Sequence, residues 1–138
     1  RPVRYLVDTN VISETRRKVP DANVLAWFRR TDPAAIYVSV LSLGEIAKGC
    51  AVIFRREPRT ARALLAWLDG LKNHYADRLI AIDADIAEEW GRLSAVRSLP
   101  VIDSLMTATA SVHNMTLVTR NLRDIDGTGV AILNPWKA

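Results

Sequence analysis

Cysteine and histidine are nearly absent from this chain of 138 residues. Cys50 is the only cysteine, so no disulfide can form within the chain, which fits a reducing compartment. His74 and His113 are the only histidines, and together with Cys50 they cannot furnish a structural zinc site. A metal ion bound by this chain would therefore be held by oxygen atoms.

Long hydrophobic runs are missing as well. The longest apolar stretch, residues 34–43, contains serines and is far shorter than the ~20 residues that span a bilayer. The N-terminal residues 1–4 lead directly into an apolar strand pattern, without the hydrophobic region of a signal peptide. No repeat or linker divides the chain. We therefore expect one domain spanning residues 1–138, in a cytoplasmic protein with no membrane segment.

The charge of the chain is moderately basic. Nineteen Lys and Arg residues against fifteen Asp and Glu residues give a formal net charge of +4, and arginines gather at positions 16–17, 29–30 and 55–62. Such clusters attract polyanions, although a solvated surface explains them equally well when charge is considered alone. Basic clusters around an acidic centre would suit an enzyme that hydrolyses phosphodiesters.

Hydrophobic periodicity predicts alternating strands and helices. Short β-branched runs indicate strands, and apolar residues at helical spacing indicate the helices between them. Strands separated by crossover helices favour an α/β fold with three layers, in which a mainly parallel sheet has helices on both faces. The predicted strands are residues 5–7, 36–40, 79–82, 116–119 and 130–133, and the predicted helices are residues 11–16, a second from 20–21 onward, 42–56, 61–73, 85–98 and 103–113.

Four acidic residues recur where a predicted strand ends or a predicted helix begins. These are Asp8, Glu45, Asp103 and Asp124. The carboxyl ends of the strands of an open α/β sheet form the edge at which ligands and metals usually bind. Four carboxylates at that edge would make a site for a hard cation such as Mg²⁺.

Each acid also has a local structural explanation. Asp8 could cap the helix that follows it, although Asn10 is the better cap candidate and would relieve Asp8 of that role. Ser42 and Glu45 have the spacing of a capping box, and Asp103 lies in a first helical turn, where negative charge is favoured. Asp124 lies in a polar turn, where aspartate is common. The matching positions of all four favour a shared site.

Five segments in order resemble the PIN-domain proteins, and within them the VapC-type toxins of the FitB branch. They are Tyr-Leu-Val-Asp-Thr-Asn-Val-Ile-Ser-Glu at 5–14, Val-Ser-Val-Leu-Ser-Leu-Gly-Glu-Ile at 38–46, Asp-Ser-Leu-Met-Thr-Ala-Thr-Ala at 103–110, Leu-Val-Thr-Arg-Asn at 117–121 and Asn-Pro-Trp at 134–136. The resemblance extends over nearly the whole chain, and the order of the five segments makes it specific.

The resemblance implies a Mg²⁺- or Mn²⁺-dependent endoribonuclease that acts as the toxin of a toxin–antitoxin pair. Its RNase activity would be neutralised by a VapB- or FitA-like antitoxin in a complex that contains a toxin homodimer and binds operator DNA through the antitoxin. The catalytic and metal-binding acids of the family correspond to Asp8, Glu45 and Asp103. The fourth is Asp124, although some members carry their acid at the position of Asn121.

The groups expected around these acids are Asn10, Thr119 and Asn121. They would orient the carboxylates or hold water.

Other functions remain open. A haloacid-dehalogenase-like phosphatase is disfavoured, because its second acid would fall at the position of Asn10. A metal-dependent DNA nuclease and a non-catalytic partner that only binds antitoxin are the alternatives. We also expect exposed apolar helix faces, at Val24, Trp27 and Phe28 and along residues 61–73, to form the dimer interface and the antitoxin groove.

Overall fold

The fold is a five-stranded parallel sheet covered by helices. The computed structural model describes residues 2–121, 125 and 127–138. The strands are β1 (Tyr5–Val7), β2 (Ile36–Ser39), β3 (Leu79–Ile80), β4 (Thr116–Val118) and β5 (Ile132–Leu133), in the spatial order β3-β2-β1-β4-β5. Every strand pair is parallel, and Leu6 of β1 lies in register between Tyr37 of β2 and Leu117 of β4.

Helices connect the strands, as the sequence predicted. They are α1 (Thr9–Glu14), α2 (Ala22–Arg30), α3 (Val40–Ile53), α4 (Pro58–His74), α5 (Ala84–Val96) and α6 (Val101–His113), with a short 3₁₀ helix at Pro33–Ala35 that periodicity did not predict. In the part of the chain that the structure describes, no helix has both the length and the apolarity needed to cross a membrane.

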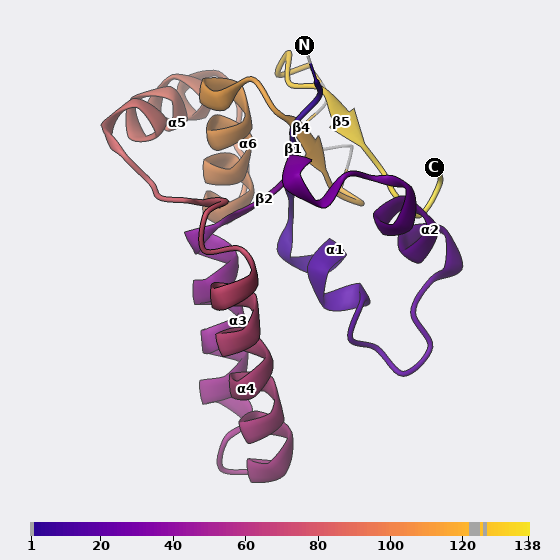
Figure 1. Ribbon diagram of the computed structural model, residues 1–138. Helices are drawn as coiled ribbons and strands as arrows, with labels where there is room; N and C mark the ends of the chain where they lie inside the picture. The colour runs from indigo at the N-terminus through magenta and orange to yellow at the C-terminus, as the bar shows by residue number, and fades with distance from the viewer. Residues whose placement is uncertain (1, 122–124, 126) are drawn as a thin grey trace.

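Alternation along the central strand separates two cores. Leu6 packs in a cluster with residues of α5 and α6, and Val7 packs in a second cluster with residues of α1 and α2. Successive side chains of a strand point to opposite faces, so each face of the sheet has its own helical layer. Figure 1 shows this arrangement, with α5 and α6 on one side of β1 and β4 and with α1 and α2 on the other. The predicted α/β fold is confirmed.

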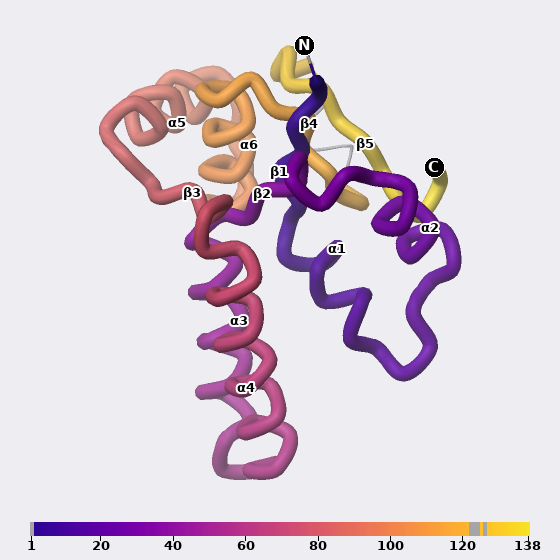
Figure 2. Tube along the Cα trace, viewed as in Figure 1, coloured from indigo at the N-terminus to yellow at the C-terminus, as the bar shows by residue number. Residues whose placement is uncertain are grey.

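Helices α3 and α4 form a long hairpin that extends away from the sheet (Figure 2). Proline is the first residue of α4. It fits there because an N–H at this position would have no hydrogen-bond partner within the helix, so its absence in proline costs nothing. The hairpin exposes the apolar side chains of Val52, Phe54 and Leu65. The hairpin is therefore one of the places where apolar side chains are exposed, and others are Val19, Val96 and Val101.

The apolar face of α2 is not exposed, which corrects the sequence-based expectation. Val24 and Trp27 are buried. The Trp27 ring makes edge-to-face contacts with Tyr5 at 5.3 Å and with Phe28 at 5.0 Å between centroids. Helical periodicity identified the face correctly, but Val24 and Trp27 are covered by packing within the chain, and only Phe28 of the three is partly exposed.

Two helix starts also differ from those predicted. Asp8, not Asn10, is the N-cap of α1, and Asn10 lies inside that helix. Ser39, not Ser42, is the N-cap of α3, because its hydroxyl accepts the Leu41 amide hydrogen bond. The Ser42 to Glu45 capping box is therefore wrong, and it does not explain Glu45.

Candidate active site at the carboxyl ends of the strands

The carboxyl ends of β1 and β4 meet at the point where the strand order reverses. From β1 the chain first builds the sheet toward β2 and β3, and it later adds β4 on the opposite side of β1. In open α/β sheets this switch point leaves a crevice beyond the carboxyl ends of the strands. Asp8 directly follows β1, and Thr119 directly follows β4.

A pocket of about 80 Å³ lies at this crevice and brings three of the predicted acids together. Asp8 comes from the end of β1, Glu45 from α3 and Asp103 from the first turn of α6. The residues that line the pocket are Asp8, Thr9, Asn10, Glu45, Ile102, Asp103, Met106, Leu117, Thr119 and Ile125. The pocket thus combines an apolar base with carboxylate, hydroxyl and amide groups.

Both carboxylate oxygens of Asp8 accept hydrogen bonds. The backbone N–H of Asn10 donates to Oδ1 at 2.6 Å, and the hydroxyl of Thr119 donates to Oδ2 at 2.6 Å. Thr119 is buried, so its hydroxyl has few other partners. Asp8 therefore caps α1 and contributes to the pocket at the same time, and the two roles fix its side chain in one orientation.

Asn121 links the Asp8 side of the pocket to Asp103. Its backbone N–H donates to the Thr119 hydroxyl oxygen at 3.1 Å, and its side-chain nitrogen lies 3.5 Å from Asp103 Oδ2. Thr119 thus contacts Asp8, and Asn121 contacts Asp103. Asn10 lines the same pocket.

Glu45 is held by Thr9, a residue that sequence reasoning missed. The Thr9 hydroxyl oxygen lies 2.5 Å from Glu45 Oε1 and 2.8 Å from the hydroxyl oxygen of Ser42. A threonine hydroxyl has a single proton, and an ionised carboxylate only accepts, so this proton goes to Glu45. The position of Thr9 directly after Asp8, at the first residue of α1, was the available signal, because its hydroxyl lies at the same edge of the sheet.

The fourth predicted acid, Asp124, lies outside the described residues. Within the described residues, no three Asp, Glu, His or Cys side chains are grouped closely enough to hold a metal ion. The donor chemistry nevertheless suits a hard cation, because the titratable side chains that line this pocket are all carboxylates. In the arrangement described here, Thr9 and Thr119 occupy oxygens that a cation would otherwise contact.

Basic residues flank the acid pocket on the side of α1. A neighbouring hollow of about 330 Å³ shares Thr9 and Glu45 with it and is also lined by Arg16 and Arg17. The Arg16 guanidinium lies 5.3 Å from the centre of the Trp67 ring, which ties the end of α1 to α4. Glu45 therefore lies on the border between the acid pocket and a hollow that also contains basic side chains.

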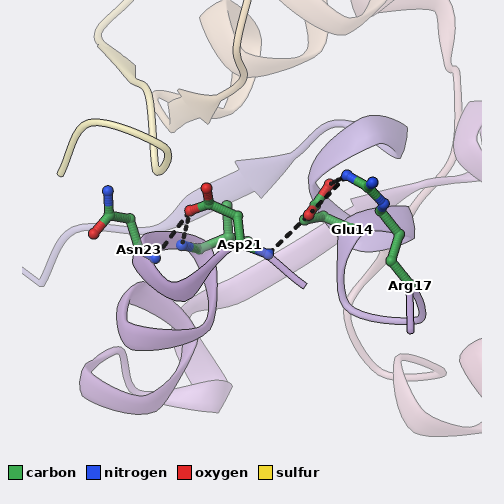
Figure 3. Close-up of polar contacts among 5 residues, drawn as sticks. Glu14, Arg17, Asp21 and Asn23 are labelled. Carbon is green, nitrogen blue, oxygen red and sulfur yellow. Dashed lines mark hydrogen bonds and ion pairs between the residues drawn. The ribbon is translucent and has the colours of Figure 1, made fainter. Parts of the chain in front are cut away.

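A buried glutamate fixes the connection between α1 and α2 (Figure 3). Glu14 Oε2 accepts the backbone N–H of Asp21 at 2.8 Å, and the Arg17 guanidinium lies 3.3 Å from both Glu14 oxygens. Asp21 in turn caps α2 through the N–H groups of Asn23 and Val24. The Asn23 side chain donates to the carbonyl of Trp136 at 2.7 Å, so this network also anchors the C-terminal turn.

Comparison with known proteins gives a consistent family. The model of the PIN domain matches residues 5–128 of the chain. The chain is 29% identical to the VapC ribonuclease Y4jK of Sinorhizobium fredii, over 96% of this chain and 97% of that protein. It is 27% identical to the toxin FitB of Neisseria gonorrhoeae, over 95% and 97% of the two chains. The crystal structure of FitAcB from Neisseria gonorrhoeae superposes with a TM-score of 0.87 at 26% identity, over 97% of this chain and 99% of that chain.

Proposed function

Since the chain belongs to the PIN-domain family, we propose that it is an endoribonuclease and the toxin of a toxin–antitoxin pair. The observation that carries the proposal is the pocket at the switch point, where Asp8, Glu45 and Asp103 converge from three elements. Similarity to a VapC ribonuclease and to the toxin FitB over nearly the full length supports the same activity.

The proposed metal site uses these carboxylates. To hold Mg²⁺ or Mn²⁺, the carboxylates of Asp8, Glu45 and Asp103 would have to lie closer together than they do in this structure. Asp124 is proposed as the fourth acid from the sequence resemblance alone. When bound, the cation would polarise the phosphate and neutralise charge on the leaving oxygen. Hydroxyl groups of Thr9 and Thr119 keep Glu45 and Asp8 oriented toward the pocket.

The proposed reaction is hydrolysis of an RNA phosphodiester. A water oxygen forms a bond to phosphorus, the bond from phosphorus to the leaving oxygen breaks, and the proton of the water passes to a base. Among the described residues, no histidine lines the pocket. The side chains able to accept the proton there are carboxylates, and Glu45 is the most exposed of the three.

A nuclease assay tests this function. The purified, antitoxin-free chain is incubated with RNA, single-stranded DNA and duplex DNA, with Mg²⁺ or Mn²⁺ and with a chelator. We expect endonucleolytic cleavage of RNA that requires the divalent ion. Cleavage of DNA alone would identify a DNA nuclease instead, and no cleavage of any substrate would indicate a non-catalytic partner.

We also propose that an antitoxin inhibits the chain by placing a basic side chain among the three carboxylates. We propose the α3–α4 hairpin as the surface for the homodimer and antitoxin contacts, and the exposed apolar side chains of Val52, Phe54 and Leu65 support this proposal. The proposed complex would bind operator DNA through the antitoxin.

Calorimetric titration of Mg²⁺ or Mn²⁺ tests inhibition at the acid pocket. Two ligands that compete for one pocket weaken each other by linkage, so the antitoxin complex should bind the ion more weakly than the free toxin. Equal affinity in both states would show that the antitoxin acts only by blocking access of RNA.

A further inference from the structure

Besides the 330 Å³ hollow that contains Arg16, another hollow adjoins the acid pocket, between α1 and the C-terminal turn. It has a volume of about 350 Å³ and is lined by Asn10, Ser13, Glu14, Arg17, Arg120 and Trp136. Asn10 lines both this hollow and the acid pocket, so the two are contiguous. The volume lies at the lower end of the range for small-molecule sites, roughly 300–1,000 Å³.

A stacked pair of planar groups forms part of its lining. The guanidinium carbon of Arg120 lies 3.8 Å from the centre of the Trp136 ring, which is direct contact across the ring face. Trp136 is half-buried, and Arg120 is exposed. Unpaired RNA bases stack on aromatic rings and on arginine guanidinium planes, so this pair offers a platform of the kind that they use.

The hollow is basic where the neighbouring pocket is acidic. Arg17 and Arg120 line it. Its one acid, Glu14, is buried and already accepts hydrogen bonds from the Asp21 amide and from Arg17. Arg17 keeps most of its side chain exposed, at 66%, so a phosphate can approach it while it contacts Glu14. The positive charges of Arg17 and Arg120 would therefore attract the phosphate groups of a polyanion that reaches the acid pocket.

We propose that this hollow binds one nucleotide of single-stranded RNA next to the phosphodiester that is cleaved. The base stacks on Arg120 and Trp136, Arg17 binds the adjacent phosphate, and the strand passes over Asn10 into the acid pocket. This assignment rests on the proposed function, and it adds the residues that position the substrate.

Equilibrium binding without turnover tests the assignment. The probe is a short fluorescein-labelled oligoribonucleotide of mixed sequence, and its anisotropy is measured with the full chain in EDTA, so that no cleavage occurs. Loss of stacking for one base weakens single-strand binding by roughly tenfold. We expect Arg120→Ala and Trp136→Ala each to raise the dissociation constant by about that factor.

Arg120→Lys separates stacking from charge. Lysine keeps the positive charge but has no planar guanidinium. Its affinity should therefore fall several-fold while the dependence of binding on salt concentration stays that of the wild type. Because Trp136 also packs against the core, the exposed Arg120 variants decide the test if Trp136→Ala fails to fold.

Arg59→Ala is the matched control. It removes the same charge from an exposed position near the start of α4, and Arg59 lines neither hollow. Its affinity should stay within about twofold of the wild type, because a single distant charge adds little to binding at moderate salt. If Arg120→Ala and Arg120→Lys bind the probe as tightly as Arg59→Ala, the nucleotide site is wrong.

Failure of this assignment and failure of the proposed function give different results. Cleavage by the wild type with no binding defect in the Arg120 variants would leave the nuclease standing and overturn the nucleotide site. Tight binding that depends on Arg120, without cleavage at any metal concentration, would support the nucleotide site and overturn the nuclease. Loss of antitoxin binding with unchanged RNA affinity in Arg120→Ala would assign the hollow to the protein partner and overturn the proposal.

Discussion

The larger cavity lies at the amino ends of the parallel strands, but most of the charged groups line the smaller pocket at the carboxyl ends. At the amino ends, a cavity of about 770 Å³ is lined by residues 2–4, by the end of α6 and by residues 128–131. Arg4 alone carries charge among the described residues that line it, and its guanidinium is engaged by the carbonyl of His113 and by the Tyr37 ring. At the carboxyl ends, a pocket of about 80 Å³ holds three carboxylates.

The comparison shows that donor groups, and not volume, mark the candidate site. Helix starts and strand ends gather at the carboxyl edge, where Asp8 and Ser39 cap helices and Asp8 also lines the pocket. At the amino edge the same fold brings helix ends, where Asn114 ends α6 in the left-handed conformation at φ 53°. The parallel topology itself therefore sends capping carboxylates to one edge.

Asp8→Asn should give the largest difference between the two edges. Asparagine caps helices as well as aspartate, so α1 is kept, while the negative charge in the pocket is lost. We expect RNA cleavage to fall on the order of 10³-fold while the chain stays folded, although the single acceptor oxygen of asparagine cannot replace both hydrogen bonds of the Asp8 carboxylate. Asp83→Asn, at the N-cap of α5, is the matched control and should cleave normally. Near-normal turnover of Asp8→Asn would show that Asp8 is only a cap.

Glu45→Gln should have the next largest effect. Glutamine can still accept the Thr9 hydroxyl, so the local structure is kept and only charge is removed. The turnover rate should fall on the order of 10²-fold. Glu88→Gln, on an exposed position of α5, is the control. A change of less than about threefold for Glu45→Gln would contradict a role of Glu45 in catalysis, because the loss of a charge-stabilising group has a much larger effect.

Thr119→Val tests whether the supporting hydroxyl matters. Valine has the same shape but cannot donate to Asp8 or accept the Asn121 amide. Loss of a group that orients a metal-binding side chain typically costs about 10-fold or more in metal affinity or activity. Thr109→Val removes another buried hydroxyl, which bonds only to its own helix at the Leu105 carbonyl, and should leave kcat unchanged. Equal kcat values for the two variants would contradict the proposed role.

Arg4→Met examines the opposite edge. It removes the one charge that lines the large cavity, and the lost contacts should lower the free energy of unfolding by about 1 kcal/mol. The cleavage rate should stay within about twofold of the wild type, because Arg4 contributes nothing to the carboxyl edge. Chemical denaturation and a cleavage assay measure the two effects. A tenfold loss of cleavage would contradict the proposal that only the carboxyl edge of the sheet takes part in cleavage.

Ser111→Ala should have the smallest effect and a defined pH dependence. The hydrogen bond from Ser111, followed by that from Arg92, lowers the pKa of Glu89. A carboxyl group with a lowered folded-state pKa stabilises the fold above its unfolded pKa, and this contribution is lost as pH falls through the folded pKa. The destabilisation by Ser111→Ala should therefore be present near neutral pH and shrink on acidification. A constant difference across the acid range would contradict this linkage.

Periodicity predicted the fold well because it depends on which residues are buried. The continuous apolar run Tyr5–Val7, which is buried on both faces of the sheet, and the helical spacing of α2 follow directly from the two cores. The same pattern could not say that the α2 face is covered by the sheet, because burial against a neighbour and exposure at an interface produce the same sequence.

The supporting residues of the site were only partly predictable. Asp8 and Asn10 are both good cap residues two positions apart, and the backbone of β1 decides between them by placing Asp8 outside the helix. Thr9 and Thr119 reach the carboxylates across large sequence separations, so only the fold reveals their contacts. The role of Asp124 stays a prediction.

The central position of β1 has a consequence for the synthesis of the chain. Asp8 and Thr119, whose side chains form a hydrogen bond, are 111 positions apart in the sequence. Ribosomes add roughly 5–20 residues per second, so about 5–20 s separate the synthesis of these two residues. Until β4 leaves the ribosome, β1 has only one of its two neighbours and the crevice has no second side. A nascent chain therefore carries Asp8 and Glu45 for many seconds without a complete pocket, and an antitoxin has that interval to accumulate before any cleavage begins.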